Sequence, residues 1–337
     1  NLRLFPFEPV YDLSPEGRGA RRPWFLVSKY LLGSYPPGPY LRVLAQEDAR
    51  LLHAHLGWEA ARAARLARRF RRPFIASFYG RDAGLLPRKA YWRELYRRLF
   101  RAADRVLAEG PHMAGVLETI GAPAARIRVV HLGIPIESFP FSERRDPGGA
   151  DPIVGLIAAS FREKKGILYA LEAMARLVGK HPRLRLRIVG DGPLRPQIRA
   201  RAEAADLGGR VAFLGYLPYP EYVEELTRAH FLLAPSVTAA DGDTEGGAPV
   251  CLIEAQASGL PCVATTHCDI PAVTRPGRSA LLAPERDVPA LAERIDELLS
   301  DPQRWPEMGM AGRAHVEAEY NIRRQVLRMN EVYRELL

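Results

Sequence analysis

Short apolar runs typical of buried strands alternate with longer amphipathic stretches along most of this 337-residue chain. A strand that is followed each time by a helix must cross back over its sheet, so we expect parallel strands with helices on both faces. No internal repeat of about 20–50 residues is present, which argues against a solenoid or a propeller. The expected strands are residues 74–78, 105–108, 128–131, 153–159, 185–189, 211–214, 231–234, 262–265 and 280–282, and the longer expected helices are residues 58–70, 88–102, 167–180, 194–205 and 289–299.

A stretch rich in proline, glycine and charge, FPFSERRDPGGADP at residues 139–152, interrupts this alternation. Such a composition is typical of a linker between domains. The chain is also long enough for two domains of about 150 residues each. We therefore expect two α/β domains, each a doubly wound sheet, divided near residue 146. Open sheets of this kind bind ligands beyond the carboxyl ends of their strands.

Composition favours a globular protein of a reducing compartment. Hydrophobic residues make up 47% and charged residues 26% of the chain, as in ordinary soluble domains. No apolar run reaches the roughly 18 residues of a membrane span, and no basic-then-apolar leader follows Asn1. The three cysteines are Cys251, Cys262 and Cys268. An odd number without CxxC spacing favours reduced thiols in the cytoplasm over disulfides or structural zinc.

Charge is distributed unevenly along the chain. Residues 1–146 hold 25 Lys and Arg against 14 Asp and Glu, a net charge of +11, although the whole chain carries only +9. A nucleic acid, an anionic membrane or a phosphorylated substrate would each suit such a front half. An Arg-favouring composition would explain it equally well. The basic amphipathic stretch at residues 61–73 could lie on anionic lipid or simply be a surface helix.

The first of four strand-ending loops in the back half is SFREKKG, residues 160–166. It contains Ser160, Arg162, Lys164 and Lys165 just before an expected helix. Free amides and the positive end of the dipole at a helix start, joined by such cations, form a seat for an anion. Judged alone, the loop also fits a solvated charge cluster.

The next two loops are GDGP, residues 190–193, and GYLP, residues 215–218. Gly190 and Gly192 permit a close approach of the backbone or a positive φ. Tyr216 could flank a flat base. Each loop alone also fits an ordinary turn between a strand and a helix.

The fourth loop, TEGGAPVCLIEA, carries two carboxylates. Glu245 precedes Gly246, Gly247, Ala248 and Pro249, which lead into a helix expected to end at Ser258 before Gly259. Glu254 lies in that helix among Leu, Ile and Ala, where a carboxylate needs a partner or a ligand. The alternatives are a helix-capping role for Glu245 and a solvated position for Glu254.

These four loops, followed by DIPAV at residues 269–273, resemble the donor domain of the family 4 retaining glycosyltransferases, most closely those of exopolysaccharide or colanic-acid type. The resemblance spans residues 74–301. It implies the α/β GT-B fold, with two Rossmann-like domains facing a cleft. The implied division is an acceptor-side domain at residues 1–146, a nucleotide-sugar donor domain at 147–315, and a C-terminal helix at 316–337 that packs back on the first domain.

The resemblance also implies roles for residues of the back half. Lys165 matches the family lysine that grips the donor diphosphate. The family arginine five positions earlier falls on Ser160, so Arg162 is expected to reach the same phosphate. Glu245 matches the glutamate that contacts the transferred sugar, and Glu254 the one that binds the ribose. Eight residues separate the two glutamates here, against seven in the family pattern.

In the front half, HAHLG at residues 53–57 and SFYGRD at 77–82 resemble loops of the acceptor domain. Tyr79 stands where the family usually has histidine. The expected acceptor-side residues are His55, Tyr79, Asp82, Glu109 and His112. Family members open with a strand and a glycine-rich loop that NLRLFPFEP does not match, so we expect a front domain without its first strand.

The implied reaction moves a sugar, with retention, from a nucleoside-diphosphate sugar (UDP or GDP) to a hydroxyl of a carbohydrate or lipid-linked acceptor. No cofactor, metal or nucleic acid is expected to take part. The expected location is the cytoplasm, with peripheral contact at the inner face of the cytoplasmic membrane. The alternatives are a silent sugar-nucleotide binder and a basic nucleic-acid-binding protein, because residues 1–146 are so basic.

Overall fold

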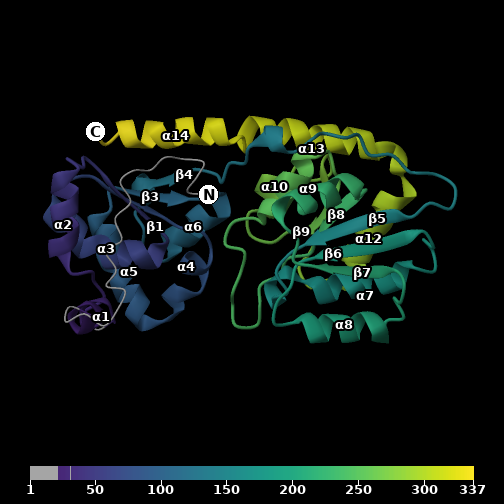
Figure 1. The fold of residues 1–337 in the computed structure, drawn as a ribbon, viewed down its shortest axis with the longest axis horizontal. Helices are drawn as coiled ribbons and strands as arrows, with labels where there is room; N and C mark the ends of the chain where they lie inside the picture. The colour runs from purple at the N-terminus through teal and green to yellow at the C-terminus, as the bar shows by residue number, and fades with distance from the viewer. Residues whose placement is uncertain (1–21, 31) are drawn as a thin grey trace. The chain divides into compact units, whose positions relative to one another are not determined.

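The computed structural model describes residues 22–30 and 32–337, and the segment NLRLFPFEP lies outside them. The chain divides into two compact units. Unit 1 comprises the described part of Asn1–Ala108 with Leu117–Arg128 and Glu331–Leu337. Unit 2 comprises Glu109–Val116 and Val129–Asn330. Each unit is built around its own sheet (Figure 1).

Unit 1 contains a four-stranded sheet in the order β1-β2-β3-β4, of which β1 to β3 pair in parallel. The strands are β1 (Leu52–His55), β2 (Phe74–Ser77), β3 (Arg105–Ala108) and β4 (Ile127–Val129). The last three were expected. β1 was not, because we interpreted residues 53–57 as a loop. Because β1 contains two histidines and is only half-buried, it lacks the continuous apolar run by which a strand is predicted.

Helix α3 (Gly57–Phe70) is rich in small buried residues. Its buried alanines include Ala60, Ala64 and Ala67, and such small side chains allow the neighbouring elements, α5 among them, to approach closely. The elements that begin between residues 22 and 126 are α1 (Arg22–Tyr30), α2 (Pro37–Gln46), α3 (Gly57–Phe70), α4 (Arg81–Gly84), η1 (Leu86–Arg88), α5 (Ala90–Ala102), α6 (Pro111–Thr119) and η2 (Ala124–Arg126).

Unit 2 contains a six-stranded parallel sheet in the order β10-β9-β8-β5-β6-β7. The strands are β5 (Ile153–Ala158), β6 (Leu184–Val189), β7 (Val211–Gly215), β8 (Phe231–Ala234), β9 (Cys262–Thr265) and β10 (Ala280–Ala283). All six were expected to within a residue at either end. The order reverses between β5 and β8, which is where a parallel sheet usually opens a binding site.

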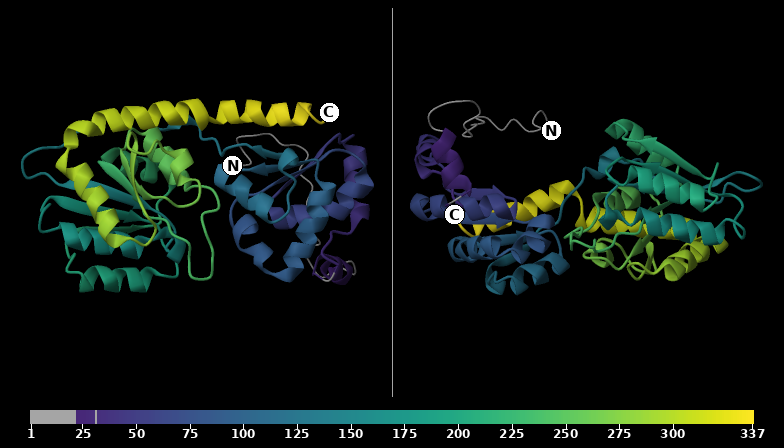
Figure 2. Two further views of the ribbon diagram at one scale, coloured as in Figure 1. Left: turned by 180° about the vertical axis from the view of Figure 1, so that it is seen from behind. Right: turned by 90° about the horizontal axis from the view of Figure 1, so that it is seen from below.

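Helices cover both faces of this sheet, as Figure 1 shows and the rear view in Figure 2 repeats. One face packs against α7, α8 and α12, and the other against α9 and α10. The elements that begin between residues 136 and 322 are η3 (Ile136–Ser138), η4 (Glu163–Lys165), α7 (Ile167–Leu177), α8 (Arg195–Ala204), α9 (Tyr219–Arg228), α10 (Val250–Ala257), α11 (Ile270–Val273), α12 (Val288–Ser300), η5 (Pro302–Arg304), α13 (Trp305–Glu319) and α14 (Ile322–Arg334).

The segment at residues 139–152, which we expected to link two domains, belongs to unit 2. Phe139 is buried in the core beneath α9 and α10. Arg144 is also buried, and its guanidinium donates to the carbonyl oxygens of Ser142 at 2.7 Å and Leu226 at 3.0 Å. These contacts fix a segment whose composition alone is that of a linker.

Two helices are divided between the units. Residues 109–116, which include the start of α6, cluster with unit 2, and residues 331–337, at the end of α14, cluster with unit 1. Within unit 1, Glu335 forms ion pairs with Arg105 at 2.8 Å and Arg128 at 3.3 Å. No helix in the described part of the chain has both the length and the apolar character needed to cross a bilayer.

Candidate functional site

A cavity of about 390 Å³ lies at the carboxyl ends of β5, β6 and β7 in unit 2. The loops after these strands contribute Ser160, Gly190 and Tyr216, and α10 contributes Glu254. Four residues that the sequence analysis assigned to one donor pocket therefore line one cavity. Tyr216 is 84% exposed, so its ring is open to a ligand.

Glu254 is held by phenols of α9. The Tyr222 hydroxyl donates to its carboxylate at 2.7 Å, and Tyr219 is a second phenol hydrogen-bonded to it. Burial raises the pKa of Glu254 above its ordinary value, although the bonds from Tyr222 and Tyr219 act in the opposite direction. The apolar neighbours of Glu254 predicted that its carboxylate needs a partner, but no motif identified Tyr222.

At two positions beyond the carboxyl ends of the unit 2 strands, the neighbouring backbone leaves room only for glycine. Gly190 has φ of +127°, and a Cβ atom there would lie 1.9 Å from the Ala159 carbonyl oxygen. Gly166, with φ of +64°, would place a Cβ atom 1.7 Å from the Pro235 carbonyl oxygen. The loops after β5, β6 and β8 can pass this closely only because both residues lack a side chain. Gly192 likewise lies against the Phe161 backbone.

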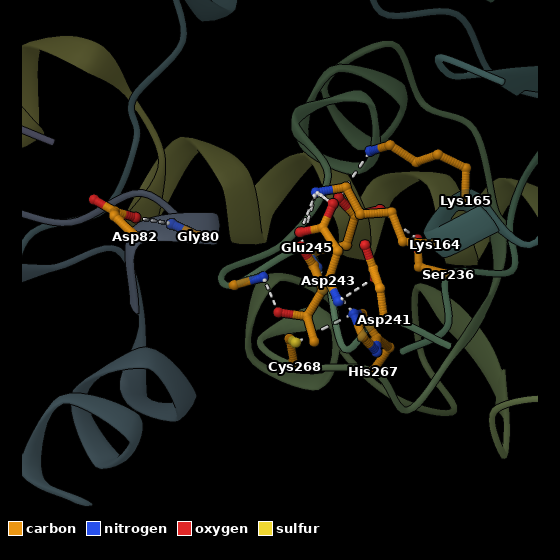
Figure 3. A network of polar contacts seen from close by, with 12 residues as sticks. Gly80, Asp82, Lys164, Lys165, Ser236, Asp241, Asp243, Glu245, His267 and Cys268 are labelled. Carbon is orange, nitrogen blue, oxygen red and sulfur yellow. Dashed lines mark hydrogen bonds and ion pairs between the residues drawn. The ribbon is translucent and has the colours of Figure 1, made fainter. Parts of the chain in front are cut away.

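Lys165 and Glu245 form an ion pair in which Nζ and Oε2 lie 2.8 Å apart (Figure 3). The other oxygen of Glu245 accepts a hydrogen bond of 2.8 Å from the Ser236 hydroxyl. The Glu245 side chain is only 7% exposed. Lys164 points to the same loop and donates to the Thr244 carbonyl oxygen at 2.8 Å.

Cys251 lies between the Lys165–Glu245 ion pair and the cavity that Glu254 lines. A second, smaller cavity is lined by Lys165, Ser236 and Cys251. Cys251, together with Ala158 and Ala159, lines both cavities. Burial raises the pKa of the Cys251 thiol to about 12, so it is a neutral wall residue. Its position could not be predicted from the sequence, since a lone cysteine carries no motif.

The TEGGAPVCLIEA loop keeps its expected place before α10. Gly246 has φ of +80°, and its N–H donates to the Thr244 hydroxyl at 3.1 Å. The Gly247 carbonyl oxygen accepts from the Asp269 N–H at 3.1 Å. Ala248 is half-buried, and Pro249 is the residue just before the first turn of α10.

Arg162 lines a different cavity from Glu254. It is exposed at the edge of a cavity of about 350 Å³ that residues of α7 and α8 also line. Lys165 rather than Arg162 is therefore the cation that accompanies Glu245.

Glu109 and His112 cluster with unit 2, not with the other residues predicted for the acceptor side. The N–H groups of His112 and Met113 donate to the buried Asp269 carboxylate at 2.7 and 3.3 Å, so Asp269 caps the start of α6. A Cβ atom on Gly247 would lie 2.6 Å from a carboxylate oxygen of Glu109. Glu109 therefore lies beside the donor loop.

A second polar cluster lies in unit 1 at the ends of β1 and β2. The rings of His53 and His55 stack with centroids 4.2 Å apart, and His55 is hydrogen-bonded to the Tyr79 hydroxyl. His53 contacts the Ser77 hydroxyl at 2.7 Å and the Tyr333 hydroxyl at 2.8 Å. Burial and the neighbouring His55 lower the pKa of His53 to about 4, so its ring is neutral near pH 7. His55, unlike His53, is exposed.

Asp82 is occupied by backbone amides. It is 1% exposed and accepts from the N–H groups of Gly57 at 2.7 Å, Gly80 at 2.8 Å and Tyr79 at 3.1 Å. Asp82 thus holds the loops after β1 and β2 together, and its carboxylate has little hydrogen-bonding capacity left for a ligand. Across residues 22–30 and 32–337, no group of three or more His, Cys, Asp and Glu side chains could hold a metal ion.

Comparison with known families gives two matches that cover most of the chain. The family described as "Glycosyl transferases group 1" matches residues 142–315, which is more than half of the chain. "Glycosyltransferase Family 4" matches residues 5–138.

Curated relatives match a smaller share of the chain than the two families together. The colanic acid biosynthesis glycosyltransferase WcaL of Salmonella typhimurium is 34% identical over 246 residues, which are 72% of this chain and 60% of WcaL. The amylovoran biosynthesis glycosyltransferase AmsK of Erwinia amylovora is 34% identical over 247 residues, 73% of this chain and 60% of AmsK. The chain thus spans about three fifths of the length of these relatives.

Among solved structures, Alr3699/HepE of Anabaena in complex with UDP aligns with a TM-score of 0.75 and 18% identity, covering 88% of this chain and 82% of HepE. This similarity, with the two sheets described above, confirms the expected GT-B fold class. The match to more than half of the chain in one family and to most of the front half in another leads to one conclusion: the chain belongs to the group 1 glycosyl transferases, with a front half of glycosyltransferase family 4 type.

Proposed function

We propose that this chain transfers a sugar, with retention of configuration, from a nucleoside-diphosphate sugar to an acceptor hydroxyl in exopolysaccharide synthesis. The observation that carries the proposal is the Lys165–Glu245 ion pair beside the cavity of Glu254 and Tyr216. The names of WcaL and AmsK support the pathway, and the UDP complex of HepE supports the class of donor.

Each part of such a donor has a chemically suitable partner. The exposed ring of Tyr216 can stack on a base. The Glu254 carboxylate can accept hydrogen bonds from the ribose hydroxyls, and Ser160 and Gly190 line the same cavity. Lys165 can bind the diphosphate, and Glu245 the hydroxyls of the sugar. UDP and GDP both fit this assignment.

The Lys165–Glu245 pair suggests how the chain promotes departure of the leaving group. A bound diphosphate would draw the Lys165 ammonium away from Glu245 and free that carboxylate oxygen for the sugar. As the bond to the sugar breaks, negative charge grows on the diphosphate, and a fixed cation stabilises it. A front-face transfer of this kind needs no protein nucleophile.

A transfer assay with radiolabelled UDP- and GDP-sugars tests the proposal, together with a thermal-shift screen of the same compounds. We expect Lys165→Ala and Glu254→Ala to lose about 100-fold or more in kcat/KM. Lys180→Ala is the matched control, since Lys180 forms its ion pair with Asp296. Wild-type turnover in both site variants would contradict the assignment of the donor site. A melting temperature that no nucleotide or nucleotide sugar changes would contradict it as well.

We further propose that a carbohydrate or lipid-linked acceptor contacts His55 and Tyr79. The exposed His55 ring and the Tyr79 hydroxyl can exchange hydrogen bonds with sugar hydroxyls, and Glu109 and His112 remain further candidates. In the same assay, His55→Ala should raise the acceptor KM and leave the donor KM unchanged. A change in the donor KM alone would contradict this role.

We also propose peripheral contact with the inner face of the cytoplasmic membrane. Arg65 and Arg68 of α3 and Arg98 and Arg101 of α5 line a cavity of about 730 Å³ in unit 1. The exposed apolar side chain of Leu32 lines the same cavity. Basic and apolar groups on one surface suit an anionic bilayer. The three free cysteines suit the cytoplasm.

Sedimentation with vesicles tests this contact. We expect binding to vesicles containing phosphatidylglycerol, little binding to phosphatidylcholine alone, and a loss of binding in Arg65→Gln/Arg68→Gln. Arg199→Gln, which removes an exposed arginine from unit 2, is the control. Equal binding by the double variant and the control would contradict the assignment.

A further inference from the structure

His267 is a buried histidine to which the proposed function assigns no role. It follows β9, and its side chain is 1% exposed. Its Nε2 atom lies 3.1 Å from the backbone nitrogen of Glu245, and its Nδ1 atom lies 2.6 Å from a carboxylate oxygen of Glu285 (Figure 3 shows His267 and Glu245). The ring thus connects the peptide of one donor-site residue to a carboxylate after β10.

These contacts determine where the proton of the ring lies. The backbone N–H of Glu245 can only donate, so Nε2 must present its lone pair. The proton is then on Nδ1, where it donates to Glu285. This neutral tautomer satisfies both partners, and its Nε2 lone pair can also accept from the Cys268 thiol, whose Sγ lies 3.2 Å away. A proton on Nε2 would instead meet the Glu245 N–H and leave Glu285 without its donor.

Glu285 is itself fixed. Its second oxygen accepts from the Thr238 N–H at 2.7 Å. Burial alone would raise the pKa of Glu285, but the Thr238 amide and the His267 ring hold it below its ordinary value. Glu285 is therefore a charged acceptor that can orient the imidazole.

The His267–Glu285 pair holds both ends of one loop. Thr238 lies near the start of the loop between β8 and α10, and Glu245 lies near its end. Glu285 binds the first and His267 the second. Ser236, the second residue of the loop, donates to the Glu245 carboxylate. The position of that carboxylate against Lys165 thus depends on contacts at both ends of the loop.

We propose that His267, oriented by Glu285, is a positioning residue that sets the Glu245 peptide and so aims its carboxylate at the transferred sugar. The inference rests on the proposed role of Glu245. Because Glu245 would act on the sugar and not on the nucleotide, loss of His267 should lower kcat more than it raises the KM for the donor. A misplacement of about 1 Å in such a group can cost about 100-fold in rate.

The first test needs no activity. In ¹⁵N-labelled, donor-free protein, long-range ¹H–¹⁵N correlation identifies which ring nitrogen carries the proton, and the signal lost in His267→Gln assigns the residue among the eight histidines. We expect the Nδ1–H tautomer in the wild type. A proton on Nε2 would overturn the proposal, whatever the enzyme transfers.

The second test is kinetic. We expect kcat to fall about 10- to 100-fold in His267→Ala and Glu285→Ala. Glu285→Gln should recover part of the rate, since its amide oxygen can still accept from Nδ1. His181→Ala is the control, because His181 forms a similar pair with Asp296 at 2.6 Å. A kcat equal to that of the control variant would refute the positioning role, while absence of transfer in the wild type would refute the proposed function instead.

Discussion

Glu245 and Glu254 lie on one short segment, yet their surroundings differ. Glu245 has a cation and a hydroxyl as partners, whereas Glu254 has two phenols. The motif predicted both carboxylates as donor ligands, and the apolar neighbours of Glu254 predicted that it needs a partner. The partners could not be predicted, because Ser236 and Tyr222 come from other elements and no spacing relates them to the motif.

The raised pKa of Glu254 predicts a stability that depends on pH. When folding raises the pKa of a carboxyl group, the group stabilises the folded protein at pH values below its ordinary pKa, which is 4.5 for glutamate. This stabilisation is lost as the pH rises through the raised pKa. Glu254→Gln does not titrate. We therefore expect the free energy of unfolding of this variant, relative to the wild type, to increase from pH 4.5 upward and then level off.

Urea unfolding at several pH values measures this difference. Glu203→Gln, on the exposed side of α8, is the charge-matched reference. A wild type that gains stability over Glu254→Gln as pH rises would contradict the expectation. The same variant should lose affinity for the donor, so that stability and binding change in opposite directions.

At the scale of elements, the sequence predicted the strands that carry the motifs and the loops that follow them. Of these strands, β5, β7 and β8 are continuous apolar runs, the clearest signal of a parallel sheet buried on both faces. In β6, Arg185 and Arg187 alternate with apolar residues. β1 escaped prediction because His53 and His55 occupy half of its four positions. The segment at 139–152 clusters with unit 2, and burial of Phe139 and Arg144 fixes it in place despite a linker-like composition. Neither effect is visible in a local pattern.

Gly166, between η4 and α7, should not tolerate a side chain. A Cβ atom there would meet the Pro235 carbonyl oxygen, and the left-handed backbone adds strain. We expect Gly166→Ala to lower the free energy of unfolding by about 2–3 kcal/mol. Gly179→Ala, where nothing lies within 4 Å of the new atom, is the control. Equal melting temperatures for the two variants would show that the loop relaxes freely.

At the scale of the whole molecule, alternation of strands and helices predicted the fold class, and four motifs in order predicted the family. The order of the strands was beyond the sequence, because the same alternation fits several arrangements of a parallel sheet. The division of α6 and α14 between units was also unpredictable, since it depends on contacts such as Asp269 with His112 and Tyr333 with His53 that join distant residues.

Residues 331–337 should stabilise unit 1 selectively. They contribute the Tyr333 hydroxyl to His53 and the Glu335 carboxylate to Arg105 and Arg128. We expect deletion of 331–337 to lower hydrogen-exchange protection in β1 and β3 and to leave β5 unchanged. Glu335→Gln alone should have a small effect, because exposed ion pairs contribute at most about 1 kcal/mol. Equal loss of protection in β5 would contradict a local role.

The division of α14 also has a consequence in time. The ribosome makes the part of unit 1 before residue 109 ahead of nearly all of unit 2, and it makes residues 331–337 only after unit 2. At about 5–20 residues per second, the first unit waits on the order of 10–40 s for the segment that completes it. During that interval His53 lacks its Tyr333 partner, and the strands of unit 1 are a candidate substrate for chaperones, whereas unit 2 can fold as it emerges.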